Sequence, residues 1–360
     1  MKPFQRRREF LKRTMTRTIL ILVSAALLGV STAEAKHTKV YVANQGSNTV
    51  TVIDDQRVSA MAAARAGSTP GANDARVADR NFAIVTTIEV GTNPIAVGMS
   101  ADGTLAYVAN LNSNSLSIID TDIDQVVATV NAGPNPRDVE ATPDGRYVLV
   151  VNQSTNSVTV LDASNYSIVA SIPVGKFPCA ISIAPDGSAA YVTNRLSNDI
   201  SIIDLATFEV TNVPVGTFAC DVMVTPDGHW AVVTNRLSGD ITIIDTATKL
   251  SVATVATGTN PQGVAFSPDG TRAYVTNAGS ISVVDMSSFT VVETIANIPS
   301  GPCPVAATMD MNKGHKGHVY VASNTQSGIV NVVDAGTNSV IAVFSVGARP
   351  LGIGIRMWPR

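Results

Sequence analysis

The chain is poor in the residues on which helical folds and much enzyme chemistry depend. Only 5% of its residues are aromatic and 15% are charged, and its 360 residues include four histidines and three cysteines. Long stretches rich in Glu, Lys and Leu are missing while Val, Ile and Thr are abundant, which excludes a helical bundle and favours an all-β protein. With 45% hydrophobic residues, the chain can bury a large core, which argues against wholesale disorder.

The first 35 residues have the layout of a cleavable export signal. Arginines and lysines precede an apolar run over residues 19–30 and a closing Ala-Glu-Ala at 33–35, an order typical of secretory signals. The run is too short to span a bilayer as a helix. The sequence Arg-Arg-Glu-Phe-Leu-Lys at 7–12 resembles a twin-arginine motif, although a start at Met15 would leave a Sec-type signal. We therefore expect a periplasmic or secreted bacterial protein with no membrane span after cleavage.

Removal of that signal changes the charge of the protein. Residues 1–35 carry seven of the 25 Lys and Arg residues and two of the 28 Asp and Glu residues, so the mature chain, 36–360, has 18 basic against 26 acidic residues and a net charge of −8. An acidic protein does not bind polyphosphate through bulk charge. Nucleic acid is therefore a possible partner but not a favoured one.

One phrase recurs along the mature chain. Tyr-Val-(Ala/Thr)-Asn is followed by a polar loop, an alternating apolar segment and an aspartate. Complete or degenerate copies of this tetrad occur at 41–44, 107–110, 149–152, 191–194, 232–235, 274–277 and 320–323. Most copies recur about every 40 residues, a period typical of β-propellers with four short strands per repeat. Seven copies predict a seven-bladed β-propeller.

Each repeat is interpreted as four strands, A to D. In one repeat the inner strand A covers 261–266, strand B 273–277, strand C 281–285 and the outer strand D 291–295. Strands A and B are joined by a Pro-Asp-Gly turn, in which Pro presets φ, Asp caps the turn and Gly accepts a positive φ. We expect the turn aspartates to be structural rather than catalytic; they are Asp102, Asp144, Asp186, Asp227 and Asp269.

Closure of the ring can be predicted as well. The mature chain starts in a strand B, 39–44, and its last segment, 350–357, matches a strand A. Pairing of the C-terminal strand with this N-terminal blade would leave no open sheet edge. Two insertions interrupt the repeats: an Ala- and Arg-rich segment at about 56–82, and a longer A–B turn around 313–318.

The tetrads and the Pro-Asp-Gly turns resemble the YVTN-repeat family of bacterial seven-bladed β-propellers over residues 38–357. This resemblance implies the fold but does not select a function. Similar propellers include surface-layer and secreted scaffold proteins, DNA-binding propellers, lactonase-like enzymes and propeller subunits of periplasmic dehydrogenases.

Strand direction divides the loops between two faces. The D–A loops, which contain Gly-x-x-Pro, and the B–C loops after each tetrad emerge together on the top face. The Pro-Asp-Gly turns and the C–D turns emerge on the bottom face. Propeller ligands usually sit at the top, around the central channel, so we expect a binding site there.

Two adjacent repeats depart together from the pattern, since each carries a Phe in its D–A loop and an Arg after its tetrad. With nearby charged residues they give seven candidate binding residues: Phe177, Arg195, Phe218, Arg236, Arg137, Asp138 and Asp221. Arginine forks beside aromatic faces suit an anionic or planar ligand, or the carboxylates of a protein partner. The alternative is a duplicated blade in which each Arg pairs with the Asp four residues later and each Phe fills the gap between blades.

The cysteines leave three alternatives open. An exported protein with three Cys invites a disulfide. Cys179 and Cys220 occupy equivalent positions on neighbouring inner strands, which places their Cα atoms beyond the limit of about 7 Å unless a loop is distorted. A disulfide, a metal-binding or reactive thiol role, and small buried residues all fit this placement, and Cys303 is left over.

Histidine and cofactor motifs are too scarce to support most catalysis. His37, His229, His315 and His318 are not expected on the top face, so a His-dependent lyase or lactonase would lack its base. The pair His315-x-x-His318 near Asp310 could bind a metal, but flanking lysines favour a solvated loop. No Cys-x-x-Cys-His and no Gly-rich phosphate loop is present, so covalent c-type haem is excluded and we expect no cofactor and no metal.

These observations favour an exported, non-enzymatic scaffold that binds an unknown protein or a small anionic ligand on its top face. Two alternatives stay open. One is a lactonase-like hydrolase that uses Arg137, Asp138 and Asp221 at the channel mouth with a bound divalent ion in place of the missing His. The other is a propeller subunit or partner of a periplasmic dehydrogenase.

Overall fold

A computed structural model describes residues 38–58, 60, 83–298, 304–305 and 317–356, all of which belong to one compact unit, Thr38–Arg360. The segment 1–35 that is expected to be an export signal, most of the 56–82 insertion, Cys303 and His315 lie outside the described residues. In the described part of the chain, no helix has the length and apolarity needed to cross a membrane.

The described residues form 28 strands in seven four-stranded antiparallel sheets. The inner strands are β4 (Pro94–Met99), β8 (Pro136–Ala141), β12 (Pro178–Ile183), β16 (Ala219–Val224), β20 (Gly263–Phe266), β24 (Pro304–Val305) and β28 (Pro350–Arg356). The second strands, which hold the tetrads, are β1 (Lys39–Asn44), β5 (Leu105–Asn110), β9 (Tyr147–Asn152), β13 (Ala189–Asn194), β17 (Trp230–Asn235), β21 (Arg272–Asn277) and β25 (His318–Ser323).

Two further strands complete each sheet. The third strands are β2 (Thr49–Asp54), β6 (Ser115–Asp120), β10 (Ser157–Asp162), β14 (Asp199–Asp204), β18 (Asp240–Asp245), β22 (Ser280–Asp285) and β26 (Ile329–Asp334). The outer strands are β3 (Ile84–Glu89), β7 (Gln125–Asn131), β11 (Ile168–Pro173), β15 (Val210–Pro214), β19 (Leu250–Ala256), β23 (Thr290–Ala296) and β27 (Ser339–Ser345).

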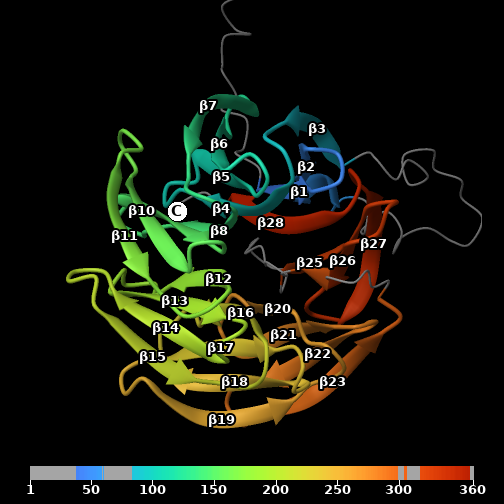
Figure 1. The fold of residues 1–360 in the computed structure, drawn as a ribbon. Helices are drawn as coiled ribbons and strands as arrows, with labels where there is room; N and C mark the ends of the chain where they lie inside the picture. Colours follow the sequence, from blue (N-terminus) through green and yellow to red (C-terminus); the bar gives the residue numbers. More distant parts are fainter. Residues whose placement is uncertain (1–37, 59, 61–82, 299–303, 306–316, 357–360) are drawn as a thin grey trace, which may run out of the picture. The chain divides into compact units, whose positions relative to one another are not determined.

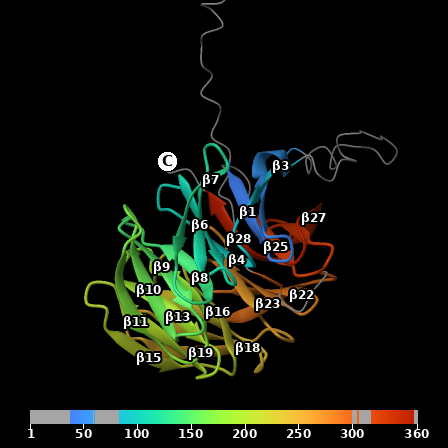
Figure 2. The ribbon, with the colours of Figure 1, turned by 45° about the horizontal axis from the view of Figure 1, so that its top comes forward.

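The sheets follow one another around a ring as the blades of a propeller, with the inner strands at its centre and the outer strands at its periphery (Figure 1). Blade 1 holds β28 and β1–β3, and blades 2 to 7 follow in chain order from β4 to β27. Figure 2 shows β28 beside β1, and their antiparallel register pairs Lys39 with Arg356 and Tyr41 with Gly354. The predicted seven-bladed fold and its closure are confirmed.

The core lies between the blades. The tetrad strands are buried on both sides because each is covered by neighbouring sheets, whereas outer strands such as β7 alternate between exposed and partly buried residues. The tetrad tyrosines also link blades through hydrogen bonds. Tyr41 Oη donates to Asp124 Oδ1 of the next blade over 2.7 Å, and Tyr274 Oη to Asn338 Oδ1 over 3.3 Å. We call these contacts the tyrosine junctions.

The junction that closes the ring corrects one interpretation of the sequence. His318 was expected in a solvated loop or a metal pair, but its ring is buried and its Nδ1 lies 2.7 Å from Asp55 Oδ1. Asp55 also accepts a hydrogen bond from Tyr320 Oη. His318 is the first residue of β25, the position that Lys39 holds in β1. Its side chain lies in the junction between two blades, so the interpretation as a solvated loop residue is wrong.

The turn aspartates have the predicted role. In the five A–B turns named above, the Asp Oδ1 accepts a hydrogen bond from the backbone N–H two residues later, over 3.0 Å from Thr104 to Asp102 and 2.9 Å from Ser188 to Asp186. The same bond is made by Asp144, Asp227 and Asp269. These bonds favour the charged form and lower the pKa of the carboxyls. The aspartates are therefore ionised parts of the turns.

Candidate functional site

The top loops of blades 4 and 5 hold two aromatic residues in a left-handed backbone conformation. Phe177 has φ 59° and Phe218 has φ 64°, and Asn93, Asn135 and Asn260 adopt similar values at the equivalent places. The N–H groups of Phe177 and Phe218 donate to the side chains of asparagines in the preceding blade, over 2.8 and 2.9 Å. The loop thus imposes this conformation whichever residue it carries, although Phe adopts it less readily than Asn.

Phe218 lies against both of the unusual arginines. The guanidinium carbon of Arg195 is 5.2 Å from the ring centroid of Phe218, and that of Arg236 is 5.8 Å away. Both distances fall in the range of cation–π contacts, which hold a guanidinium in place while its N–H groups remain able to donate. The sequence predicted that these three residues would gather on the top face, and the structure brings them together. Phe177 is 37% exposed.

The aspartates four residues after the arginines serve the B–C loops. Asp199 accepts hydrogen bonds from Asn194 Nδ2 over 2.8 Å and from Ser197 Oγ over 3.0 Å. Asp240 has the equivalent partners at 2.7 and 3.1 Å. The duplicated-blade alternative expected these carboxylates to pair with the arginines; the bonds that their Oδ1 atoms accept come from their own loops.

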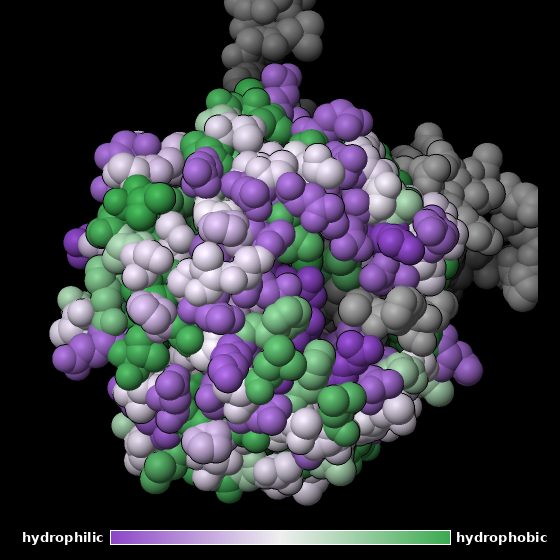
Figure 3. Space-filling view, viewed as in Figure 1, coloured by the Kyte–Doolittle hydropathy of each residue, from purple (hydrophilic) through white to green (hydrophobic). Residues whose placement is uncertain are grey.

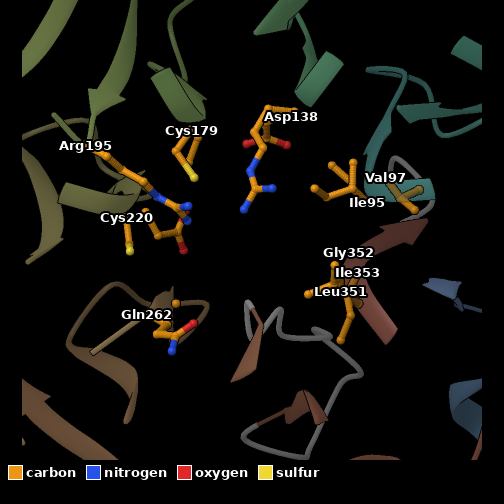
Figure 4. Close-up of a pocket in the computed structure, with 15 residues that line it drawn as sticks. Ile95, Val97, Asp138, Cys179, Arg195, Cys220, Gln262, Leu351, Gly352 and Ile353 are labelled. Carbon is orange, nitrogen blue, oxygen red and sulfur yellow. The ribbon is translucent and has the colours of Figure 1, made fainter. Parts of the chain in front are cut away.

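A cavity of about 140 Å³ lies among the upper ends of the inner strands. Figure 4 shows its polar and sulfur-bearing side chains on one side and its apolar side chains on the other. The first group is Asp138, Cys179, Arg195, Cys220 and Gln262, and the second is Ile95, Val97, Leu351 and Ile353. Arg137 also lines this space, which we call the mouth cavity. Its volume is close to that of a cavity that holds one benzene ring.

The carboxylates of the mouth cavity also join neighbouring blades. Asp138 Oδ2 accepts a hydrogen bond from the N–H of Ile181 over 2.9 Å, and Asp221 Oδ2 accepts one from Val264 over 3.0 Å. The other oxygen of each accepts the N–H of the next residue on its own strand, at 2.9 Å in both cases. Both aspartates also line a second cavity of about 310 Å³ among the lower parts of the inner strands.

Burial keeps a substantial fraction of these acids protonated near neutral pH. Desolvation raises the pKa of Asp138 to about 6, against the effect of its two backbone hydrogen bonds. Desolvation and the charge of Asp138 raise the pKa of Asp221 to about 7. Glu140, which accepts the N–H of Ile183 over 3.0 Å, has a pKa raised well above its usual range, chiefly by burial. The channel therefore contains three coupled carboxyl groups.

The wall of the channel leaves little room beside these acids. Gly98 occupies the position of Glu140 in blade 2, and a Cβ added there would lie 2.3 Å from the carbonyl oxygen of Val139 in blade 3. Neighbouring inner strands therefore approach too closely for a side chain at this point. At the same position in blade 3, Glu140 is accommodated and accepts the N–H of Ile183 in the next blade.

Both described cysteines are free and buried, so the disulfide considered for Cys179 and Cys220 is not formed. Desolvation raises the pKa of Cys220 to about 12, against a smaller opposite effect of Arg195. A buried neutral thiol is a poor nucleophile. The structure thus favours small buried residues among the three alternatives.

Two residues of the channel were missed as site candidates. Gln262 lines the mouth cavity and occupies the place in its blade that Arg137 has in blade 3, so alignment of the Gly-x-x-Pro segments contained the signal. Glu140 lies two residues beyond Asp138 on β8 and therefore faces the same side of the strand. Among the described residues, no group of three or more His, Cys, Asp and Glu side chains has a geometry suited to a metal ion.

Figure 3 shows one face of the ring as a mixed surface on which hydrophilic and hydrophobic side chains alternate over all blades. Side chains of both kinds border the hollow at its centre. A broad apolar field of the type that marks large permanent interfaces is not visible on this face in the described residues.

Two family models match parts of the chain. A model described as a lactonase with a 7-bladed beta-propeller matches residues 33–167, and a YNCE-like beta-propeller model matches residues 182–272. Each covers less than half of the chain, which is thus similar to both families over those segments. No curated protein matches the chain in sequence.

Several solved structures share the fold. Hydrazine synthase from Kuenenia stuttgartiensis has a TM-score of 0.63 and 20% identity, with 79% of this chain and 92% of that one covered. A functionally unknown protein from Desulfotomaculum acetoxidans has a TM-score of 0.72 and 17% identity, with 89% and 99% covered. The dihydro-heme d1 dehydrogenase NirN in complex with DHE has a TM-score of 0.59 and 18% identity, with 88% and 74% covered. At these identities the likeness concerns the fold alone.

Proposed function

We propose that this protein is an exported binding protein whose top face takes a carboxylate-bearing ligand, or a carboxylate of a protein partner, at the mouth cavity. The observation that carries the proposal is the contact of Arg195 and Arg236 with one aromatic ring, that of Phe218. Arg195 also lines the mouth cavity together with Arg137.

The arrangement suits an anion with an apolar body. Guanidinium groups bind carboxylates through two parallel hydrogen bonds, and contact with an aromatic ring reduces the freedom that such a side chain loses on binding. The apolar wall formed by Ile95, Leu351 and Ile353 would cover the remainder of the ligand. Such a site has arginines at its rim, whereas Asp138 and Asp221 carry part of a negative charge at neutral pH, so a ligand carboxylate is favoured beside the arginines and not beside these acids.

The distribution of charge between the two faces also favours binding of an anion on the top face. The bottom face carries the aspartates of the A–B turns and those that end the third strands, from Asp120 to Asp334. The top loops carry Lys176, Arg195, Arg236 and Arg349. An anionic ligand would therefore be attracted to the top face and repelled from the bottom face, although the mature chain as a whole is acidic.

Binding of benzoate by the mature chain, measured by titration calorimetry at low salt, tests the proposal. Benzoate has one carboxylate on one ring and so matches both walls of the mouth cavity. We expect the double variant Arg195→Ala/Arg236→Ala to weaken benzoate binding at least about tenfold while its Tm stays close to that of the unchanged protein. Neutral benzamide should bind more weakly than benzoate.

Arg146→Ala is the matched control. Its guanidinium also lies over an aromatic ring, that of Tyr147 at 5.0 Å, but on the bottom face. This variant should bind benzoate normally. If the double variant keeps full affinity, or if benzamide binds as tightly as benzoate, the proposed role of the arginines is wrong.

A second candidate function, a lactonase-like hydrolase, is favoured by one observation: Asp221, whose pKa is raised to about 7, lines the same cavity as Arg195. An ionised Asp221 would take a proton from water as the water oxygen attacks the lactone carbonyl carbon. Arg195 would stabilise the oxyanion, and the ring C–O bond would then break with return of the proton to the leaving oxygen. The similarity of residues 33–167 to a lactonase model supports this candidate.

Hydrolysis of γ-butyrolactone followed in a pH-stat distinguishes the two candidates. A hydrolase would show a rate that rises with pH through about 7 and that is lost in Asp221→Asn. If hydrolysis is no faster than in buffer alone, the hydrolase candidate is rejected and the binding function remains. A role as propeller subunit of a dehydrogenase rests on likeness of fold and remains a prediction; the layout of residues 1–35 supports export in all three cases.

A further inference from the structure

At several interblade junctions the residue that begins the tetrad strand reaches across to the next blade at the lower end of the sheet. Lys39 Nζ donates to Asp124 Oδ2 over 2.7 Å and to the carbonyl of Thr121 over 3.0 Å in the next blade. Trp230 packs edge-on against Phe289, with ring centroids 5.3 Å apart. In six blades this first residue is large: Lys39, Leu105, Tyr147, Trp230, Arg272 and His318.

Blade 4 is the exception, because β13 begins with Ala189. A cavity of about 570 Å³ lies beside this alanine, between blades 4 and 5 on the bottom face. We call it the bottom cavity. It is lined by parts of both A–B turns, by one C–D turn and by two core residues: Pro185, Asp186, Ser188, Ala189, Tyr191, Asp204, Asp227, Gly228, Thr246, Ala247 and Lys249. The missing large side chain accounts for the space.

Tyr191 lines this cavity with an unused hydroxyl. Its side chain is only 2% exposed, and no hydrogen-bond partner of its Oη is found among the described residues. The equivalent Tyr41 and Tyr274 donate to Asp124 and Asn338, but Lys249 stands at that place in blade 5 and offers no acceptor. Tyr191 lines the bottom cavity, so its hydroxyl is available to a molecule bound there.

Three carboxylates line the same cavity as the hydroxyl, and hydrogen bonds within their own turns orient them. Oδ1 of Asp186 accepts the N–H of Ser188 over 2.9 Å, and Oδ1 of Asp204 accepts that of Ala206 over 2.9 Å. Their Oδ2 atoms have no hydrogen-bond partner within the described part of the chain. Asp227 Oδ2 lies 3.1 Å from His229 Nδ1.

The charges of the bottom cavity are unbalanced. Hydrogen bonds within the turns lower the pKa of Asp186, Asp204 and Asp227, so all three are ionised at neutral pH. Lys249 is the single cation among the described lining residues. Burial, and secondarily the charge of Asp186, raises the pKa of Tyr191 to about 12, so its hydroxyl stays neutral.

We propose that the bottom cavity binds a small organic cation with primary ammonium groups, a diamine or polyamine, through Asp186, Asp204 and the hydroxyl of Tyr191. Each ammonium group supplies three donors, which match the free Oδ2 atoms and the Tyr191 oxygen. The ligand would replace the cation that Lys39 provides at the junction of blades 1 and 2. A monovalent anion is disfavoured by three carboxylates against one ammonium.

Titration of the mature chain with spermidine at low salt tests this inference. Spermidine should bind to the unchanged protein. Ala189→Trp should abolish binding, because the indole would fill the cavity as Trp230 fills the equivalent junction, and its Tm shows whether the variant is folded. Asp186→Asn, which keeps the turn, should weaken binding about tenfold.

Asp144→Asn is the matched control, since Asp144 has the same place in the A–B turn of blade 3 and does not line the cavity. It should bind spermidine normally. The variant Arg195→Ala/Arg236→Ala on the opposite face should also bind spermidine normally, so the proposals for the bottom cavity and for the mouth cavity are tested independently. The inference is overturned if spermidine does not bind, if folded Ala189→Trp binds it unchanged, or if Asp144→Asn and Asp186→Asn lose equal affinity.

Discussion

His318 Nδ1 lies 2.7 Å from Oδ1 of Asp55, although the two residues are 263 positions apart in the sequence. His318 begins β25 in blade 7, whereas Asp55 directly follows β2 in blade 1. The phenol of Tyr320 donates to the same carboxylate. Together with the pairing of β28 and β1, this buried contact joins the last blade to the first. Closure therefore combines a shared sheet with a polar side-chain contact.

Loss of the Asp55 carboxylate should open this junction. Asp55 is 1% exposed, so Asp55→Ala removes a buried carboxylate that both His318 and Tyr320 contact and should lower the free energy of unfolding by about 3 kcal/mol. Urea unfolding followed by circular dichroism measures the change. His318→Lys should cost much less than His318→Ala, because Lys39 makes the equivalent contact at blade 1. Equal losses in both His318 variants would contradict a paired role.

The tyrosine junctions predict different effects for chemically identical substitutions. Tyr41→Phe removes a buried 2.7 Å hydrogen bond to Asp124 and should cost about 1–2 kcal/mol. Tyr191→Phe removes a hydroxyl that has no partner among the described residues and should be nearly neutral. Both variants keep the ring and its packing, so the difference in their urea midpoints reports the hydrogen bond alone. A Tyr191→Phe variant as unstable as Tyr41→Phe would contradict this assignment.

The acids of the channel predict that stability falls as the pH rises. Asp221 has an ordinary pKa of 3.8, raised to about 7 by burial in the folded protein. The folded state therefore binds a proton more tightly than the unfolded chain, and this contribution is complete below about pH 4 and is lost as the pH passes about 7. Asp138, with a pKa of about 6, acts in the same direction.

Thermal unfolding at pH 5 and pH 8 measures this effect. We expect the unchanged protein to lose about 1–2 kcal/mol between these values, a loss limited by the partial exposure of both acids. Asp221→Asn should reduce the difference. Asp269→Asn is the control, because hydrogen bonds lower the pKa of Asp269 and move its titration below this window. A pH difference that is unchanged in Asp221→Asn would contradict the assignment.

The sequence predicted features that recur, and it failed where single blades differ. The aspartates of the turns and the pairing of β28 with β1 follow from spacing and turn chemistry that the chain repeats. The tetrad does not reveal that Asp138 spans two blades, because its acceptor role depends on the register of Ile181 in the next sheet. His318 was misinterpreted for the same reason, since its partner lies 263 residues away.

For the candidate site too, the sequence predicted which residues lie near one another but not the contacts between blades. Alignment of the repeats placed Phe218, Arg195 and Arg236 on one part of the top face, as observed. It gave no sign that both arginines would contact the same ring, because that depends on how far blade 5 is turned relative to blade 4. The bottom cavity also escaped notice, although Ala189 is visible as the one small residue among seven equivalents.

The thiols of the mouth cavity should be unreactive until the protein unfolds. Cys179 and Cys220 are buried and free, and burial raises the pKa of Cys220 to about 12, so almost none of it is thiolate at pH 8. In a Cys303→Ser background, Ellman's reagent should label neither thiol of the native protein and both in denaturant. Rapid labelling of the native protein would show a reactive thiol, and no labelling in denaturant would show a disulfide. Labelling only on unfolding would identify both cysteines as small buried residues of the channel wall rather than as reactive groups of the mouth cavity.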